Sequence, residues 1–175
     1  VVKGPLNNAL VFLDLNSDGI KDSDEPSVRT GSDGSYTLTT SNSSFTIVAI
    51  SDDTTIDTSS GTVMSGITLK APSGATVVTP TTTLIQEGDL TAAQVATVLG
   101  LPSGVDPTSF NPYSSGVDAT KALAVEKVSQ QLMSVVNSFA ASAEGAGASQ
   151  ANAFTASLKS VVEVVKSKAT ASGTL

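Results

Sequence analysis

The sequence predicts an α+β protein in which an antiparallel β-sandwich, of the transthyretin or immunoglobulin kind, precedes a helical hairpin subdomain. Short apolar runs separated by Asp, Ser and Gly clusters fill the first half, as in sandwich proteins. The second half contains amphipathic stretches with apolar residues at helical spacing. We therefore expect a β domain over residues 1–83 and a helical domain over residues 84–175. The Thr- and Pro-rich segment 79–83 is either the boundary between them or an ordered connection inside one α+β unit.

The strands of the first half are predicted from short runs that are bounded by turn residues. Residues 35–39 alternate polar and apolar side chains, which is typical of a half-buried strand. The segment Gly31–Gly34 before them has a glycine at each end and an aspartate inside, and it indicates a turn. The remaining strands are expected at 9–13, 28–29, 45–50, 63–69 and 76–78.

The helices of the second half are predicted from capping residues and apolar stripes. Thr91 and Gln94 form a capping-box pattern that starts a short helix, which ends near Leu99. Asp118 is the N-cap of a long helix, and the glycines of 145–147 separate it from a last helix. The stripes predict an antiparallel hairpin that packs on the β part or on a neighbouring module. Their residues are Val125, Val128, Leu132, Val135, Val136, Phe139, Phe154, Leu158, Val161, Val162 and Val165.

Composition excludes several function classes. The chain has no Cys and no His, which excludes disulfides, thiolate chemistry and a His-based triad and argues against zinc or copper. The net charge of -7 lies entirely in residues 1–90, without a basic patch, so we expect no nucleic acid and no membrane insertion. Aromatic residues are few and include no Trp, which disfavours a sugar-binding cleft. We expect no catalytic residues and no enzyme activity.

The acidic residues are densest between Asp14 and Glu25. Counted from Asp14, oxygen-bearing side chains stand at positions one, three, five, nine and twelve. Gly19 stands at position six, where the loop needs a positive φ, and Ile20 at position seven offers its main-chain carbonyl. This spacing predicts an EF-hand-type loop that binds Ca²⁺, because calcium takes about six to eight oxygen ligands from a flexible loop. The predicted ligands are Asp14, Asn16, Asp18, Ile20, Asp22 and Glu25.

The flanks of this loop do not resemble a helix–loop–helix hand. A strand-like apolar run precedes Asp14, and Pro26 directly follows the last predicted ligand. A loop of this kind lacks the paired helices that open when a sensor binds calcium. We therefore expect the metal to make the module rigid rather than to switch it.

Residues 13–26, followed by 30–38, are similar to the calcium-binding B-type repeats of serine-aspartate adhesins. The likeness is carried by the acidic loop and by the Asp33–Tyr36 segment after it, and it covers roughly residues 5–50. It implies a transthyretin-like sandwich in a surface protein, with calcium stiffening the stalk. It also implies that the metal is held by the residues predicted above.

The segments 66–84, 99–102 and 106–107 resemble repeats of giant, type I-secreted bacterial surface adhesins. That likeness covers nearly the whole chain and implies an extracellular tandem-repeat module, at the cell surface or in a biofilm. The implied partners are neighbouring copies of the same module, in tandem or by self-assembly. Because the chain starts without Met in a strand-like segment, we also expect it to be a piece of a longer protein.

Further candidate groups stay open. Asp52, Asp53 and Asp57 form either a second calcium site or a solvated turn, and Asp33 is either a turn residue or an additional ligand. Related sandwiches form Lys–Asn isopeptide bonds, and Lys3 lies in a suitable early strand, although the sequence marks no partner for it.

The leading function hypothesis is a calcium-stabilised structural repeat module of a large extracellular bacterial surface or adhesion protein. One alternative is a calcium-dependent subunit of a self-assembled extracellular filament or layer. Another is a glycan- or peptide-recognition domain, which would need an aromatic or polar cluster that the sequence does not display.

Overall fold

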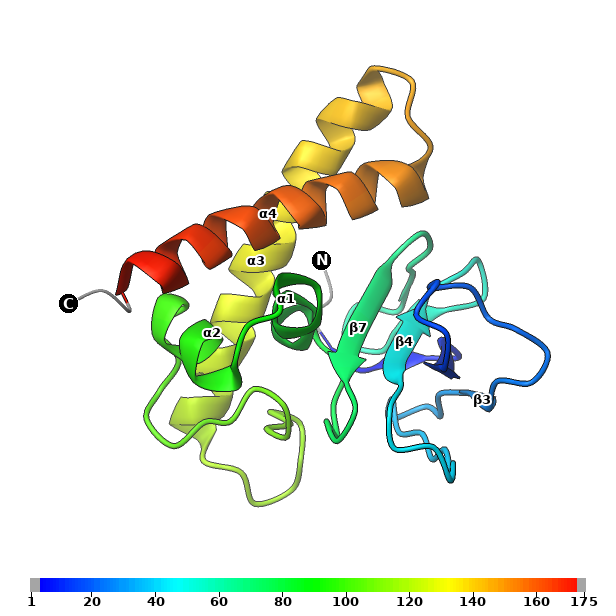
Figure 1. Ribbon diagram of the computed structural model, residues 1–175, viewed down its shortest axis with the longest axis horizontal. Helices are drawn as coiled ribbons and strands as arrows, with labels where there is room; N and C mark the ends of the chain where they lie inside the picture. Colours follow the sequence, from blue (N-terminus) through cyan, green and yellow to red (C-terminus); the bar gives the residue numbers. More distant parts are fainter. Residues whose placement is uncertain (1–3, 173–175) are drawn as a thin grey trace.

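The computed structural model describes residues 4–172, and Lys3 lies outside them (Figure 1). Within this range the protein is mixed α+β, with two antiparallel sheets followed along the chain by four helices. The predicted α+β class is therefore confirmed. None of the helices in the described part of the chain is long and apolar enough to cross a membrane.

The larger sheet has four strands in the order β3-β2-β4-β7. Its register pairs Val11 with Ala49 and Leu13 with Ile47, so these apolar side chains share one face. Tyr36, which lies in a segment without strand pairing, packs against the core on this face. The strands are β2 (Leu10–Asp14), β3 (Ser27–Arg29), β4 (Thr46–Ile50) and β7 (Thr68–Pro72).

The smaller sheet has three two-residue strands in the order β1-β5-β6. β1 comes just before β2 in the chain, so the small sheet is tied directly to the large one. Its strands are β1 (Leu6–Asn7), β5 (Ile56–Asp57) and β6 (Thr62–Val63).

Three of the expected strands are wrong in whole or in part. Residues 35–39 and 76–78 form no strand, and neither segment is a member of either sheet. In residues 35–39 the alternation of polar and apolar side chains reflects burial and not strand pairing. Tyr36 and Leu38 pack on the sheet, but their main chain forms no hydrogen-bonded pair with it. The expected strand at 63–69 is divided between β6 and β7 by a turn at Gly66, whose φ is 73°.

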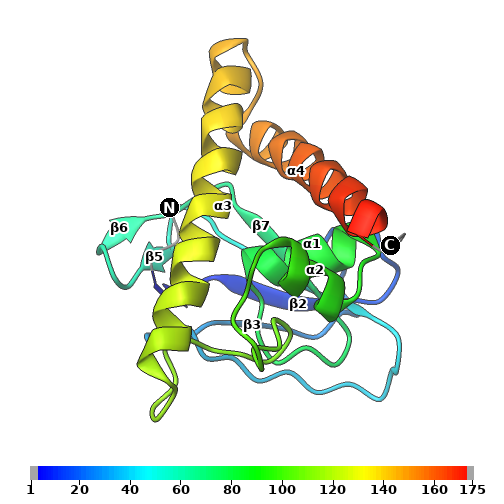
Figure 2. The ribbon, with the colours of Figure 1, turned by 90° about the vertical axis from the view of Figure 1, so that its left-hand side faces the viewer.

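The predicted helices are all present, and α4 extends beyond its expected apolar stripe. Thr91 and Asp118 are the N-caps of α2 and α3, as expected. Figure 2 shows α3 and α4 diverging from their short connection, and the two helices pack against each other over part of their length. The helices are α1 (Pro80–Gly88), α2 (Ala92–Val98), α3 (Ala119–Gly145) and α4 (Gln150–Ser172).

α1 begins in the Thr- and Pro-rich segment for which the sequence predicts a boundary or a connection, so the structure corrects that expectation. The start of α1 nevertheless carries the local signals of a helix: Thr79 is the N-cap, Pro80 is at the first turn, and Thr82 completes a capping box. The helix lies beside β7 (Figure 1). The short apolar part of α1 has too few residues to display a clear helical period in the sequence.

The contact between α1 and β7 is made by threonine hydroxyls. The Lys70 N–H donates to Thr83 Oγ1 at 2.9 Å, and Thr82 Oγ1 donates to the Lys70 carbonyl at 2.8 Å. β7 is an edge strand, so these main-chain groups have no strand partner on that side. Both threonines are almost completely buried. The hydroxyls therefore satisfy main-chain groups at a partly buried sheet edge.

All four helices and the end of the sheet share one apolar core. Leu69 of β7, Leu84 of α1, Val95 of α2, Met133 of α3 and Phe154 of α4 belong to it, and each is buried. The helices thus pack on the sheet of the same chain. The division into domains at residues 83 and 84 stays a prediction, although that position lies inside α1.

Replacing Thr83 by Val is expected to lower the free energy of unfolding by about 1 kcal/mol or more, because the partly buried Lys70 N–H loses its acceptor. Urea denaturation followed by circular dichroism measures this. The control is Thr97→Val, which removes an equivalent hydroxyl from an exposed position of α2 and should change stability by less than about 0.5 kcal/mol. Equal effects of the two changes would contradict a special role for the edge contact.

Candidate metal centre

The acidic loop connects two paired strands of the larger sheet. Asp14 is the last residue of β2, and Glu25 lies just before β3. The Leu13 N–H donates to the Pro26 carbonyl at 3.0 Å, which closes the base of the loop. Asp14 is 1% exposed and Glu25 is 5% exposed. The first and last predicted ligands are thus held inside the protein at neighbouring positions.

The Asp14 carboxylate organises the first turn of the loop. Its Oδ1 accepts from the Ser17 N–H at 2.6 Å, and its Oδ2 accepts from the Gly19 N–H at 2.8 Å. Gly19 has a φ of 76°, which glycine adopts at little cost. The predicted positive φ at the sixth loop position is therefore present.

The Glu25 carboxylate joins the start of the loop to its later part. Its Oε1 accepts from the Leu15 N–H at 2.7 Å, and its Oε2 accepts from the Asp22 N–H at 3.0 Å. Both oxygens are directed into the loop, as a bidentate ligand requires. The two buried carboxylates together fold the segment around its own main-chain amides.

The three middle side chains meet through the Asn16 amide. Asn16 Nδ2 donates to Asp18 Oδ2 at 3.2 Å and to Asp22 Oδ2 at 2.9 Å. Asn16 Oδ1 accepts from the Asp18 N–H at 3.0 Å. The side chain of Ile20 is 65% exposed, which is consistent with a residue whose predicted role uses only its carbonyl. Asn16, Asp18 and Asp22 are therefore linked by side-chain hydrogen bonds, whereas Asp14 and Glu25 accept from main-chain amides of the same loop.

No group of three or more acidic side chains in residues 4–172 is arranged as a ready metal shell. The carboxylates are bonded to amide donors instead. The donor chemistry nevertheless fits a hard cation, because every predicted ligand is an oxygen. Neither Asp14 nor Glu25 has an ion pair with a basic residue in the described part of the chain. Lys21, the one base in the loop, donates to the Asp22 carbonyl at 2.7 Å.

The loop also faces the helical half. Asp18 and Gly19 line a polar cavity of about 300 Å³ together with Lys70 of β7, Glu87 of α1 and Lys159 of α4. Lys70 Nζ forms an ion pair with Glu87 Oε1 at 2.7 Å. The acidic loop, the sheet edge and two helices therefore meet around one charged space.

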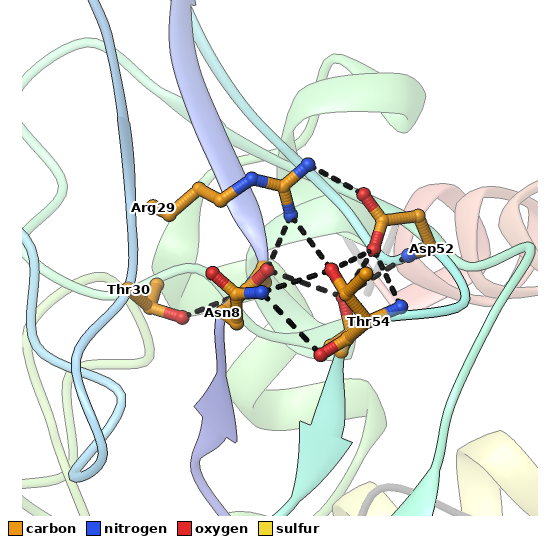
Figure 3. A network of polar contacts seen from close by, with 7 residues as sticks. Asn8, Arg29, Thr30, Asp52 and Thr54 are labelled. Atoms are coloured by element: carbon orange, nitrogen blue, oxygen red, sulfur yellow. Dashed lines mark hydrogen bonds and ion pairs between the residues drawn. The ribbon is translucent and has the colours of Figure 1, made fainter.

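The alternative calcium site at Asp52, Asp53 and Asp57 does not form a shared group. Asp52 Oδ2 is paired with Arg29 Nη2 at 2.6 Å, so a guanidinium already compensates this carboxylate (Figure 3). Asp57 is buried within β5, where its Oδ1 accepts from Ser59. Asp52 is therefore a turn residue, whereas Asp57 is buried in a strand and is not part of a solvated turn.

The Arg29–Asp52 pair belongs to a network that joins strand ends. Arg29 Nη1 donates to the Asn8 carbonyl at 2.6 Å and to Thr54 Oγ1 at 3.3 Å, and Asn8 Nδ2 donates to Thr54 Oγ1 at 2.9 Å (Figure 3). The Arg29 guanidinium, with help from Thr54, holds the pKa of Asp52 well below its usual range. The network had no sequence signal, because its members lie far apart along the chain.

Asp33 is a turn residue in the structure. Its Oδ1 accepts from the Ser35 N–H at 3.0 Å, and the hydrogen bonds with Ser35 lower its pKa. It does not lie in the acidic loop. Its interpretation as a turn residue is therefore favoured over that of an additional ligand.

No protein-family model, no curated protein and no solved structure matches this chain.

The stability that the Arg29–Asp52 pair contributes is expected to depend on pH. The folded-state pKa of Asp52 is lowered from 3.8, so the contribution is present above that pH and decreases as the pH falls further. Asp52→Asn should lower stability by at most about 1 kcal/mol at pH 7, because both side chains are partly exposed, and by less at pH 3. Urea denaturation at both pH values measures the difference. Asp53→Asn is the control, and an unchanged Asp52→Asn effect at pH 3 would contradict the assignment.

Proposed function

We propose that this chain is a calcium-stabilised structural module of a large extracellular bacterial surface or adhesion protein. The observation that carries the proposal is the Asp14–Glu25 loop, which closes on two buried carboxylates without a basic partner in the described residues. Buried carboxylates of this kind are costly unless a cation compensates them. The EF-hand spacing of the oxygen donors selects Ca²⁺ over smaller ions.

The proposed architecture of the first half is a sandwich-like arrangement related to the B-type repeats. It is supported by the way Tyr36, Leu38 and Phe45 pack against the face of the larger sheet. In this proposal an irregular segment supplies part of the second layer. For the second half we propose the helical hairpin, supported by the packing of α3 on α4 across a short connection.

Calcium would act on this module as a source of rigidity. Without a cation, the carboxylates of the loop repel each other and oppose its closed form. A metal that binds only the folded state adds about 2.7 kcal/mol when its free concentration is 100 times Kd. Extracellular calcium modules have Kd values on the order of 10⁻⁴–10⁻³ M, so millimolar external calcium contributes part of this.

The position of the loop supports an effect on the whole module. Asp18 and Gly19 border the same polar cavity as Lys70, Glu87 and Lys159. A loop that is fixed by a metal therefore presents a fixed surface to β7, α1 and α4. In a tandem array, such stiffening would keep successive copies of the module extended, which is the task of a surface stalk.

Addition of 2 mM Ca²⁺ to the EGTA-treated protein is expected to raise the thermal midpoint by several degrees, since 1 kcal/mol corresponds to about 2–4 °C at this size. Glu25→Gln and Asp14→Asn should abolish the shift, because each removes a ligand charge at the base of the loop. Differential scanning calorimetry and isothermal titration calorimetry measure stability and binding.

Asp24→Asn is the matched control, because it removes one charge from the same loop at an exposed position that is not a predicted ligand. It should keep the calcium response, and Mg²⁺ should produce a smaller one. The absence of both a midpoint shift and binding heat with the unaltered protein would refute the proposal. If Asp24→Asn also lost the calcium-dependent shift of the thermal midpoint, the shift would arise from the net charge of the loop and not from coordination by the predicted ligands.

A further inference from the structure

A cavity of about 500 Å³ lies between the larger sheet and the irregular segment 101–116. Val11 and Ala49 of the sheet form part of its wall, and Val105 and Val125 contribute from the segment and from α3. None of its lining residues belongs to the acidic loop. The cavity is therefore independent of the proposed calcium site.

The wall of this cavity is unusually rich in the scarce aromatic residues of the chain. The sequence contains two tyrosines, and both of them, Tyr36 and Tyr113, line it together with Phe110. Protein interiors are close-packed, and voids much larger than a water molecule are few. Cavities of about 300–1,000 Å³ with apolar walls and a few polar groups are typical of small-molecule sites.

The wall is also stiff, because four of its members are prolines. Pro5 and Pro80 come from the start of β1 and α1, while Pro107 and Pro112 come from the irregular segment. Proline fixes φ and leaves the backbone little freedom to collapse into the space. A cavity that is preformed in this way avoids part of the ordering cost of binding.

The charges at the cavity are all of one sign. Within residues 4–172, Asp33 and Glu126 are its charged lining residues, and no Lys or Arg of that range lines it. The Tyr113 hydroxyl is hydrogen-bonded to Glu126, and burial together with this carboxylate raises the pKa of Tyr113 well above its usual range. A tyrosine that stays protonated donates its hydrogen, which orients the carboxylate and leaves its other lone pairs to accept from a ligand.

We propose that this cavity binds a small apolar molecule that carries a protonated amine. The apolar body lies against the aliphatic and aromatic wall, and the ammonium group is held by the Glu126 carboxylate. Tyr36 and Tyr113 also line the cavity, and aromatic rings attract cations. A carboxylic acid of the same shape is repelled, because both charged groups of the wall are acidic.

The test uses three probes that share one apolar body: 2-phenylethylamine, 2-phenylethanol and phenylacetate. Binding to the isotope-labelled chain is followed by NMR titration, and the shifts are mapped onto the lining residues. We expect 2-phenylethylamine to bind about fivefold more tightly than the alcohol. A partly exposed ion pair contributes about 1 kcal/mol, which corresponds to about a fivefold change in Kd. We expect phenylacetate to bind most weakly of the three.

Two kinds of variant separate charge from shape. Glu126→Gln keeps an acceptor for Tyr113 but removes the charge, so the preference for the amine over the alcohol should fall about fivefold. Ala49→Leu fills the cavity from the sheet and should abolish binding of every probe. Ala93→Leu makes the same change on the exposed face of α2 and should leave binding unaltered.

Ser129→Phe fills the same cavity from α3 and replaces Ala49→Leu if that variant does not fold, as judged by circular dichroism. Three results would overturn the proposal. They are no shift at the lining residues with any probe, phenylacetate binding as tightly as the amine, and unaltered binding in a folded cavity-filling variant. None of these depends on calcium, so the metal site and this cavity are tested separately.

Discussion

The free edge of β7 is satisfied by two threonine hydroxyls of α1, and the attachment of the helices to the sheet depends on this contact. Thr82 and Thr83 give the Lys70 main chain the partners that another strand would otherwise supply. An unpaired edge invites association with other chains, and covering it with a helix removes that risk. Because α1 is fixed there, its apolar residues are presented to α2, α3 and α4, and the common core forms around them.

The same region of the sheet determines where the acidic loop lies. The antiparallel pairing of β2 with β3 and β4 brings Asp14 to the end of a buried strand and Glu25 beside it. Lys70 belongs to the edge strand that α1 covers, and its side chain borders the cavity next to the loop. A metal bound in the loop would consequently act at the junction of the two halves, where rigidity affects both.

The proposed calcium loop and the aromatic cavity use the sheet and its connections in different ways. The loop connects the ends of two strands. The cavity lies between one face of the larger sheet and the irregular segments that cover this face. Segment 35–39 and the irregular segment 101–116 cover that face without pairing with it. Irregular segments pack less uniformly than strands or helices, and this leaves room for a binding cavity beside a well-packed core.

The sequence by itself determined the features that depend on local spacing. The oxygen positions between Asp14 and Glu25, the glycine with positive φ, and the N-caps Thr91 and Asp118 are properties of neighbouring residues, so they could be predicted. Only the tertiary structure decided that residues 35–39 stay unpaired, that α1 covers the edge of β7 and that Arg29 pairs with Asp52. These outcomes depend on which segments meet across long separations in the chain. The local pattern of polar and apolar residues indicates which side chains are buried, but not which distant segment they contact.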